Sequence, residues 1–355
     1  MIDTSSTGQR VLVCCAEFHS YHKIIAAGFE RLGHVCELFD ERDSPDAVSK
    51  ALTRLKLRQL SPRAMRAFRK KLARRTRDFR PDVILIIAPE MIDPLAIAAL
   101  RVAAPGVRII LYMWESLVRK PLGRPLLGLV DQAFSYDTVD CEAVDGIDFL
   151  PLFHTLDNMP VAPEPRPGGD MVFIGSVQFA RLIALAAISR TLARKGQGSF
   201  FFLYAPTLLH WLIFKAAARL FGYRGQVARH QISHREYLSR HDEAACIIDI
   251  QRGNQTGLAL RSFDAIFAGK PLLTTNLLTP RYDFYDKAPV GLFAPGDDLK
   301  VPDVNEAAWP DAELHERYKL STWIKVLMGS RSAAPYLERA QSGTSVPQSA
   351  EHARS

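Results

Sequence analysis

The sequence has little of what places a protein in a membrane. Among its 355 residues, no uncharged apolar run reaches the roughly 18 residues that a membrane-spanning helix needs. Residues 1–10 are polar and lack the apolar segment of a secretory signal peptide. We therefore expect a cytoplasmic protein, and a peripheral position at the inner face of the cell membrane stays open.

Cysteine is scarce and is not spaced to bind metal. The five cysteines form an odd number, with no Cys-x-x-Cys pair and no Cys/His spacing typical of zinc sites. Most lie in apolar runs, where cysteine behaves as a small core residue. No Asp-x-Asp motif follows an apolar strand. The sequence predicts a reducing compartment, no bound metal and no cofactor.

Acidic residues are fewer than basic ones. The chain has 45 Lys and Arg against 38 Asp and Glu, which gives a formal net charge of +7. Such a balance favours anionic partners, among them nucleotides, nucleic acid and acidic lipid. Because the sequence has neither a ladder of stacking aromatics nor a helix-turn-helix pattern, we expect no binding to nucleic acid.

Basic and apolar residues alternate in the stretch 54–80. A basic amphipathic helix of this kind suits an anionic membrane surface and would hold the protein near a lipid-linked molecule. The apolar segment 210–221 would add a second contact. The alternative for 54–80 is a solvated helix that covers a sheet.

Strand-like and helix-like segments alternate in two blocks. Short apolar runs typical of buried strands alternate with helical segments, which favours parallel sheets covered by helices. The Pro- and Gly-rich stretch 161–169 interrupts this rhythm. We therefore predict an α/β protein with two Rossmann-like parallel-sheet domains facing a cleft. The expected parts are a domain at 1–160, a linker at 161–169, a domain at 170–310, a helical segment at 311–340 and a disordered tail at 341–355.

Ligands of such sheets bind beyond the carboxyl ends of the strands, and the crevice between two domains is the default site. The turn after the strand predicted at 170–175 holds Gly175 and Ser176. The turn after the strand at 246–250 holds Gln255, Thr256 and Gly257, whose backbone N–H groups at a helix start would suit a phosphate.

Several motifs together resemble the GT-B glycosyltransferases, and most closely a bacterial capsular and lipopolysaccharide group related to CgeB-like proteins. The likeness covers most of residues 80–290 and is densest at 247–293. The motifs are Tyr112-Met-Trp-Glu-Ser116, Phe173-Ile-Gly-Ser176 with Arg181, Gln255-Thr-Gly-Leu258, Arg261, Asp264, Gly269-Lys270, Thr274-Thr-Asn276 and Tyr282-Asp-Phe-Tyr285. Glu115 and Asp264 replace the usual Asp and Glu of the family.

The resemblance implies a metal-independent, hexosyltransferase-like enzyme. It would move a sugar from a nucleotide-sugar donor to a surface-polysaccharide or lipid-linked acceptor. The turn with Gly175, Ser176 and Arg181 would face the diphosphate, Arg261 would neutralise it, and Asp264 would hold the ribose hydroxyls. The other donor-binding candidates are Gln255, Thr256, Gly257 and Asn276.

Each of these donor-binding residues also has a purely structural interpretation. The two turns would be ordinary strand–helix connections, Ser176 a helix cap and Asn276 a turn residue. Arg261 would be a surface arginine or form a helical pair with Asp264.

An inverting transfer needs a carboxylate or imidazole near the acceptor hydroxyl, whereas a retaining transfer can proceed without one. Glu17 and His19, in the first strand–helix loop, are the leading candidates, and Glu115 and Asp137 end neighbouring strands. Two other functions fit the same pattern: a nucleotide-sugar epimerase of this fold, and a binding protein that retains the donor site without turnover.

Overall fold

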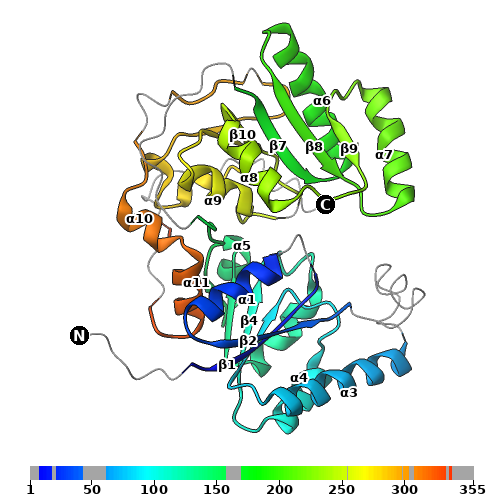
Figure 1. Ribbon diagram of the computed structural model, residues 1–355, viewed down its shortest axis with the longest axis vertical. Helices are drawn as coiled ribbons and strands as arrows, with labels where there is room; N and C mark the ends of the chain where they lie inside the picture. The colour runs from blue at the N-terminus through cyan, green and yellow to red at the C-terminus, as the bar shows by residue number, and fades with distance from the viewer. Residues whose placement is uncertain are drawn as a thin grey trace.

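The computed structural model describes residues 8–17, 21–42, 61–156, 169–253, 255–297, 299–303, 308–332 and 336–337. Figure 1 shows two α/β lobes, one above the other, each built on a six-stranded sheet. Every strand pair in both sheets is parallel. The predicted α/β class with two parallel sheets is confirmed.

The first lobe contains a sheet with the strand order β2-β1-β3-β4-β5-β6. Its central strands are apolar and buried on both faces, because helices cover both sides of a parallel sheet. The strands are β1 (Arg10–Cys15), β2 (Val35–Asp40), β3 (Val83–Ile87), β4 (Arg108–Met113), β5 (Gln132–Ser135) and β6 (Asp148–Phe149). The helices are α1 (Tyr21–Arg31), α3 (Pro62–Phe79), α4 (Pro94–Ala103), η2 (Pro121–Leu129) and α5 (Thr138–Ala143).

The second lobe repeats this plan with the strand order β12-β11-β10-β7-β8-β9. The strands are β7 (Met171–Ser176), β8 (Ser199–Tyr204), β9 (Gln226–Ala228), β10 (Cys246–Asp249), β11 (Leu272–Thr274) and β12 (Val290–Leu292). The helices are α6 (Phe179–Arg194), α7 (Leu208–Phe221), α8 (His234–Glu243), α9 (Leu260–Phe267), η3 (Thr279–Arg281) and η4 (Tyr285–Lys287). Ser233 caps α8 by accepting a hydrogen bond from the backbone N–H of Glu236.

The helix α3 accounts for most of the stretch 54–80, in which basic and apolar residues alternate. Met65, Phe68 and Leu72 on one side of α3 are buried in the core of the first lobe. Only its basic side faces solvent, so from residue 61 onward this segment is a helix that covers the sheet. Residues 54–60 lie outside the described part of the chain. None of the described helices is long and apolar enough to cross a bilayer.

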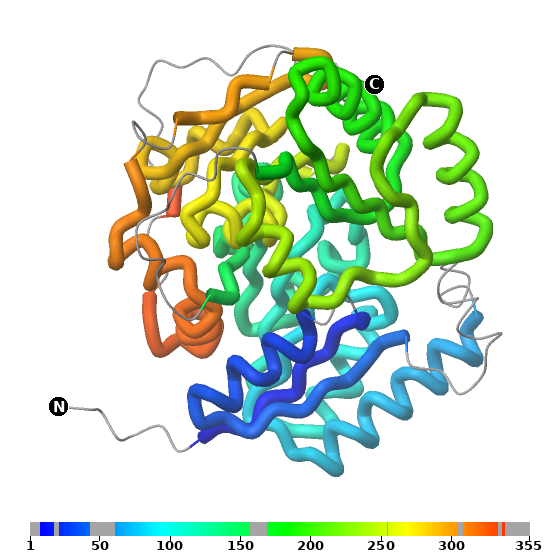
Figure 2. The backbone as a smooth tube through the Cα atoms, turned by 45° about the horizontal axis from the view of Figure 1, so that its top comes forward, coloured from blue at the N-terminus to red at the C-terminus, as the bar shows by residue number. Residues whose placement is uncertain are grey.

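The chain returns to the first lobe at its end through α10 (Ala312–Arg317) and α11 (Leu320–Leu327). The sequence predicts a helical segment at 311–340; its described residues form two short helices, with a break at Tyr318 and Lys319. Figure 2 shows this orange-red segment against the blue α1. Arg108 on β4 fixes the end of α11 by donating to the carbonyl of Met328 at 2.8 Å.

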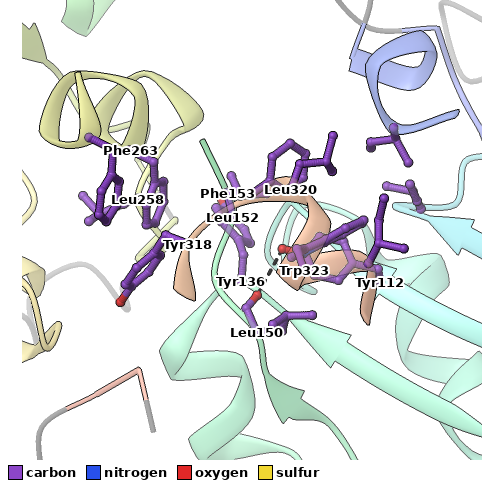
Figure 3. Packing of buried hydrophobic residues seen from close by; sticks show 14 of the residues in the cluster. Tyr112, Tyr136, Leu150, Leu152, Phe153, Leu258, Phe263, Tyr318, Leu320 and Trp323 are labelled. Atoms are coloured by element: carbon purple, nitrogen blue, oxygen red, sulfur yellow. Dashed lines mark hydrogen bonds between the residues drawn. The ribbon is translucent and has the colours of Figure 1, made fainter. Parts of the chain in front are cut away.

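An aromatic seam joins the two lobes. Trp323 of α11 packs edge-on against Tyr112 with ring centroids 4.8 Å apart, and against Phe153 at 5.0 Å. Tyr318 then stacks on Phe263 of α9 at 5.5 Å. These rings belong to one buried cluster that contains residues of both sheets, part of which Figure 3 shows. Since the seam is continuous, the relative position of the lobes is set by packed side chains. The predicted linker at 161–169 is described only at Gly169.

Candidate functional site

The carboxyl edges of the two sheets face each other. Asp137 follows β5 in the first lobe, and Thr256 follows β10 in the second. The backbone N–H of Thr256 donates to Asp137 Oδ2 at 2.8 Å, and the Thr256 hydroxyl donates to Asp137 Oδ1. Asp137 also caps α5 and is buried. The strand ends predicted to bind ligand therefore meet at one crevice, and Asp137 is a structural link across it.

Gly257 and Asn276 support this contact between the lobes. A Cβ at Gly257 would lie 2.5 Å from the ring and the carbonyl oxygen of Tyr136, so the absent side chain makes room for that residue. Asn276 is buried and donates to the carbonyl of Thr256 at 2.8 Å. The carbonyl of Gln255 accepts from the Gln251 side chain. Because this loop is held in an extended path, α9 begins at Leu260, later than the predicted start at Thr256.

Two arginines flank one aromatic ring at the carboxyl edge of the second sheet. The guanidinium of Arg181 on α6 lies 5.2 Å from the centroid of Phe173, and that of Arg261 on α9 lies 5.0 Å from it. Phe173 is fully buried in β7. A cation over an aromatic face is stabilised by the ring quadrupole. The ring thus holds two like charges near each other.

Arg261 is fixed by an acidic residue that the sequence motifs do not include. Its Nη1 donates to Asp249 Oδ1 at 2.5 Å, at the end of β10. The other oxygen of Asp249 accepts from the Thr274 hydroxyl at 3.2 Å, at the end of β11. The alternative pair between Arg261 and Asp264 does not form. The Asp249 carboxylate thus holds the guanidinium group of Arg261 at the ends of β10 and β11.

Arg181 carries its charge in a buried position without an ion pair. It donates to the carbonyls of Ser176 and Ile250 at 3.0 and 2.9 Å, and its Nε has no partner. Burial, with the nearby charge of Arg261 as the next cause, lowers the pKa of Arg181 to about 9. A depressed arginine pKa means that the protonated form lacks compensation in this position. An anion at the site would supply it.

Two further arginines lie near this site, Arg252 from the second lobe and Arg119 from the first. Arg252 follows β10, and burial lowers its pKa, with Arg119 of the first lobe as the next cause. Arg119 pairs with Glu115 at 3.4 Å. The two lobes together bring four guanidinium groups and two carboxylates to this region, a net charge of +2 that becomes +1 when the Asp137 carboxylate at the same crevice is counted. We call this set (Arg119, Arg181, Arg252, Arg261, Glu115 and Asp249) the arginine cluster.

Gly175 and Ser176 are the last two residues of β7, beside the arginine cluster, and not part of the turn that follows the strand. A Cβ at Gly175 would lie 3.2 Å from Nη2 of Arg261 and 3.0 Å from the ring of Phe173. Gly175 therefore allows the arginine to lie flat against the strand. Ser176 contributes its carbonyl to Arg181, and it has no capping hydrogen bond to α6.

Asp264 is not open to the crevice. Its carboxylate is 2% exposed and accepts from the Tyr237 hydroxyl at 2.9 Å and from the N–H of Thr155 at 3.4 Å. Burial raises the pKa of Asp264 to about 6. In this arrangement the residue ties α9 to α8 and to the end of the first lobe. A contact with ribose hydroxyls would require it to release the Tyr237 hydroxyl.

Glu17 lies two residues after the end of β1, and its side chain is largely exposed. Its Oε1 lies 3.7 Å from Nε2 of His22, in the first turn of α1. His22 is buried, and burial lowers its pKa more than the Glu17 carboxylate raises it. His19 lies outside the described residues. The described residues contain no group of three or more His, Cys, Asp or Glu side chains able to hold a metal ion.

The sequence motifs include Arg181 and Arg261 but not the residues that surround these two arginines in the structure. Asp249 was detectable as a carboxylate at the end of the buried strand Ile247–Ile250. Arg252, in the same turn, was detectable as a cation two residues beyond that strand. Nothing in the local pattern points to Phe173, because a buried aromatic in a strand is ordinary core.

No protein-family model matches this sequence, and no curated protein matches it. Solved structures match almost the whole chain. A UDP-forming trehalose-phosphate synthase from Burkholderia xenovorans has 12% identity, covers 90% of this chain and 99% of its own, and gives a TM-score of 0.56.

The fold is GT-B. The Anabaena protein HepE, in complex with UDP-glucose, has 11% identity over 92% of this chain and 100% of its own, with a TM-score of 0.52. The UDP-GlcNAc 2-epimerase of Methanocaldococcus jannaschii, with UDP-GlcNAc and UDP, has 10% identity over 91% and 99%, with a TM-score of 0.50. At such identities the likeness shows the fold alone, and the narrower family that the motifs resemble stays a prediction.

The burial of Asp264 predicts a pH-dependent loss of stability. Its folded-state pKa of about 6 lies above the ordinary value of 3.8, so the folded protein holds this proton more tightly than the unfolded chain. The resulting stabilisation is complete below pH 3.8 and is lost as the pH rises through 6. Asp264→Asn should remove this pH-dependent stabilisation, because the amide does not titrate. Between pH 4 and 7 the free energy of unfolding of the variant should gain about 2 kcal/mol relative to the parent protein.

Urea unfolding of both proteins across this pH range measures the difference. Asp286→Asn removes one exposed carboxylate and controls for the change in net charge. A difference between Asp264→Asn and the parent that stays constant with pH would show that Asp264 is ionised throughout.

Proposed function

We propose that this protein is a glycosyltransferase that binds the diphosphate of a nucleotide-sugar donor at the arginine cluster. The observation that carries the proposal is Arg181, which is buried without an ion pair where guanidinium groups outnumber carboxylates at the facing strand ends. A charge buried in this way is costly, and the cost falls when an anion binds. A diphosphate carries the matching charge.

The cluster suits the chemistry of sugar transfer. When the bond between sugar and diphosphate breaks, negative charge builds up on the leaving diphosphate. Fixed guanidinium groups in a partly buried crevice stabilise that charge without a metal ion. Arg261 is held by Asp249 and Arg181 by two backbone carbonyls, so neither needs to reorganise. Gly175 and Ser176 line the same strand ends, and we propose that the loop of Gln255, Thr256, Gly257 and Asn276 borders the donor.

The first lobe would receive the acceptor. Glu17 follows β1 by two residues, at the carboxyl edge of the first sheet, and we propose it, with His19 in the same loop, as the base that takes the acceptor proton. The acceptor class that fits the sequence motifs is a surface polysaccharide or a lipid-linked sugar, and the transferred group a hexose. Two proteins of this fold bind UDP-glucose and UDP-GlcNAc, so we expect a uridine nucleotide first.

Donor binding should stabilise the folded protein. In a thermal-shift screen of UDP-, GDP-, CMP- and dTDP-sugars, we expect one nucleotide to raise the unfolding midpoint, because a ligand that binds only the folded state stabilises it by mass action. Arg261→Met should abolish that shift, since it removes a cation from the cluster.

The single substitution also leaves Asp249 buried without its partner, so Arg261→Met/Asp249→Asn serves as the second variant. It keeps the net charge of the cluster and should fold, yet it should also fail to bind. Arg194→Met removes an exposed arginine of α6 and should keep the full shift. A full shift in both Arg261 variants would refute the donor site.

A second prediction concerns Glu17. With the donor found above and an acceptor extract, Glu17→Gln should lower transfer by about 10²–10⁴-fold, the usual contribution of a general base. The thermal shift should stay, because the residue lies on the opposite lobe from the diphosphate. Unchanged transfer in the variant would exclude Glu17 and leave His19, or a retaining reaction without a base.

The epimerase of this fold defines the alternative function. An epimerase would convert the donor sugar in the absence of any acceptor, which NMR of the incubated donor detects. A rise in the unfolding midpoint with the donor, without either transfer or epimerisation, would identify a binding protein that has lost turnover.

A further inference from the structure

The helix α7 is apolar on both its inner and its outer side. Phe214, Ala217 and Ala218 are buried against the second sheet. On the opposite side, Leu208, Leu212 and Leu220 recur at four- and eight-residue spacing and are 51%, 52% and 81% exposed. A surface helix of a soluble protein normally presents polar residues outward. The outer side of α7 therefore lacks the usual solvated face.

The neighbouring helix α6 extends this apolar surface. Figures 1 and 2 show α6 and α7 together at the outer edge of the second lobe. Phe179 and Ile183 of α6 are about half exposed, and the Phe179 ring lies 4.6 Å from that of Phe214. We call this set (Phe179, Ile183, Leu208, Leu209, Leu212, Ile213 and Leu220) the α7 face. It contains 7 of the 16 large hydrophobic residues that are exposed in the described chain.

The chain segment that contains the α7 face carries charge of one sign. From Met171 to Arg235 the chain contains nine Lys and Arg and no Asp or Glu, although the whole chain has 38 acidic residues. Lys215 and Arg219 lie on the exposed side of α7 itself. The ammonium of Lys215 is 4.5 Å from the centroid of Trp211, whose indole N–H donates to the carbonyl of Val227 at 3.0 Å. An apolar face with basic neighbours and an interfacial tryptophan suits an anionic bilayer surface.

We propose that the α7 face docks on an anionic lipid bilayer, with its leucines among the acyl chains and its basic residues at the headgroups. The basic helix α3 does not supply such a contact in its described part, because Met65, Phe68 and Leu72 are packed in the core. A second copy of the chain is a poorer occupant, since the uniform positive charge would repel itself. The docking surface contains no residue of the arginine cluster and does not depend on the proposed reaction.

Vesicle sedimentation of the full chain tests the proposal. The protein should sediment with vesicles of phosphatidylcholine mixed with phosphatidylglycerol, and less with phosphatidylcholine alone. Leu209→Gln/Leu212→Gln should weaken partitioning to the mixed vesicles by about tenfold or more, since it removes two apolar anchors. Lys215→Gln/Arg219→Gln should weaken it on the mixed vesicles alone and reduce its dependence on salt.

Leu95→Gln/Val102→Gln is the matched control. It makes the same kind of change at two exposed apolar residues of α4, in the other lobe, and should leave partitioning unchanged. Equal unfolding midpoints of the variants and the parent protein establish that each is folded.

Two results would overturn the proposal. One is failure of the parent protein to sediment with the mixed vesicles, or an equal loss in the α4 control. The other is a parent protein that is a dimer by light scattering and a Leu209→Gln/Leu212→Gln variant that is a monomer, which would make the α7 face a contact between copies.

Discussion

Two guanidinium groups around one buried ring determine how the second lobe is organised. A cation removed from water is stable only with counter-charges or hydrogen-bond acceptors around it. Arg261 has the Asp249 carboxylate, whereas Arg181 has only the carbonyls of Ser176 and Ile250. Phe173 provides the face on which both rest. The strand ends of the second sheet are thereby arranged around positive charge before any ligand arrives, which is the pre-organisation that an anion-binding site needs.

The contacts between the lobes determine which part of the first lobe faces the guanidinium groups of the second. The Asp137–Thr256 hydrogen bonds and the close approach of Tyr136 to Gly257 hold the strand ends of one sheet opposite those of the other. The aromatic seam through Trp323 secures the same arrangement from the side. Consequently Arg252, from the second lobe, lies in the field of Arg119 from the first.

The local pattern of the sequence was enough to predict the strands, the parallel sheets and the turns that follow β7 and β10. Arg181 and Arg261 followed from the family motifs, and the structure places both at the expected edge. The roles of Gly257 and Asp264 could not be read in this way, because their partners Tyr136, Tyr237 and Thr155 are distant in sequence. A small residue in a turn looks the same whether a phosphate or a tyrosine fills its space. The burial of one side of α3 likewise depends on tertiary contacts, which the local sequence pattern does not contain.

The central claim is that the arginine cluster binds a diphosphate, and calorimetric titration tests it most directly. UDP, GDP, CDP and dTDP would each be titrated into the protein beside the matching nucleoside. The account predicts that one diphosphate binds and that its nucleoside binds at least about a hundredfold more weakly, because the charge-assisted hydrogen bonds to the phosphates are lost. Equal affinity of the diphosphate and its nucleoside, or no binding of any of the four, would contradict it.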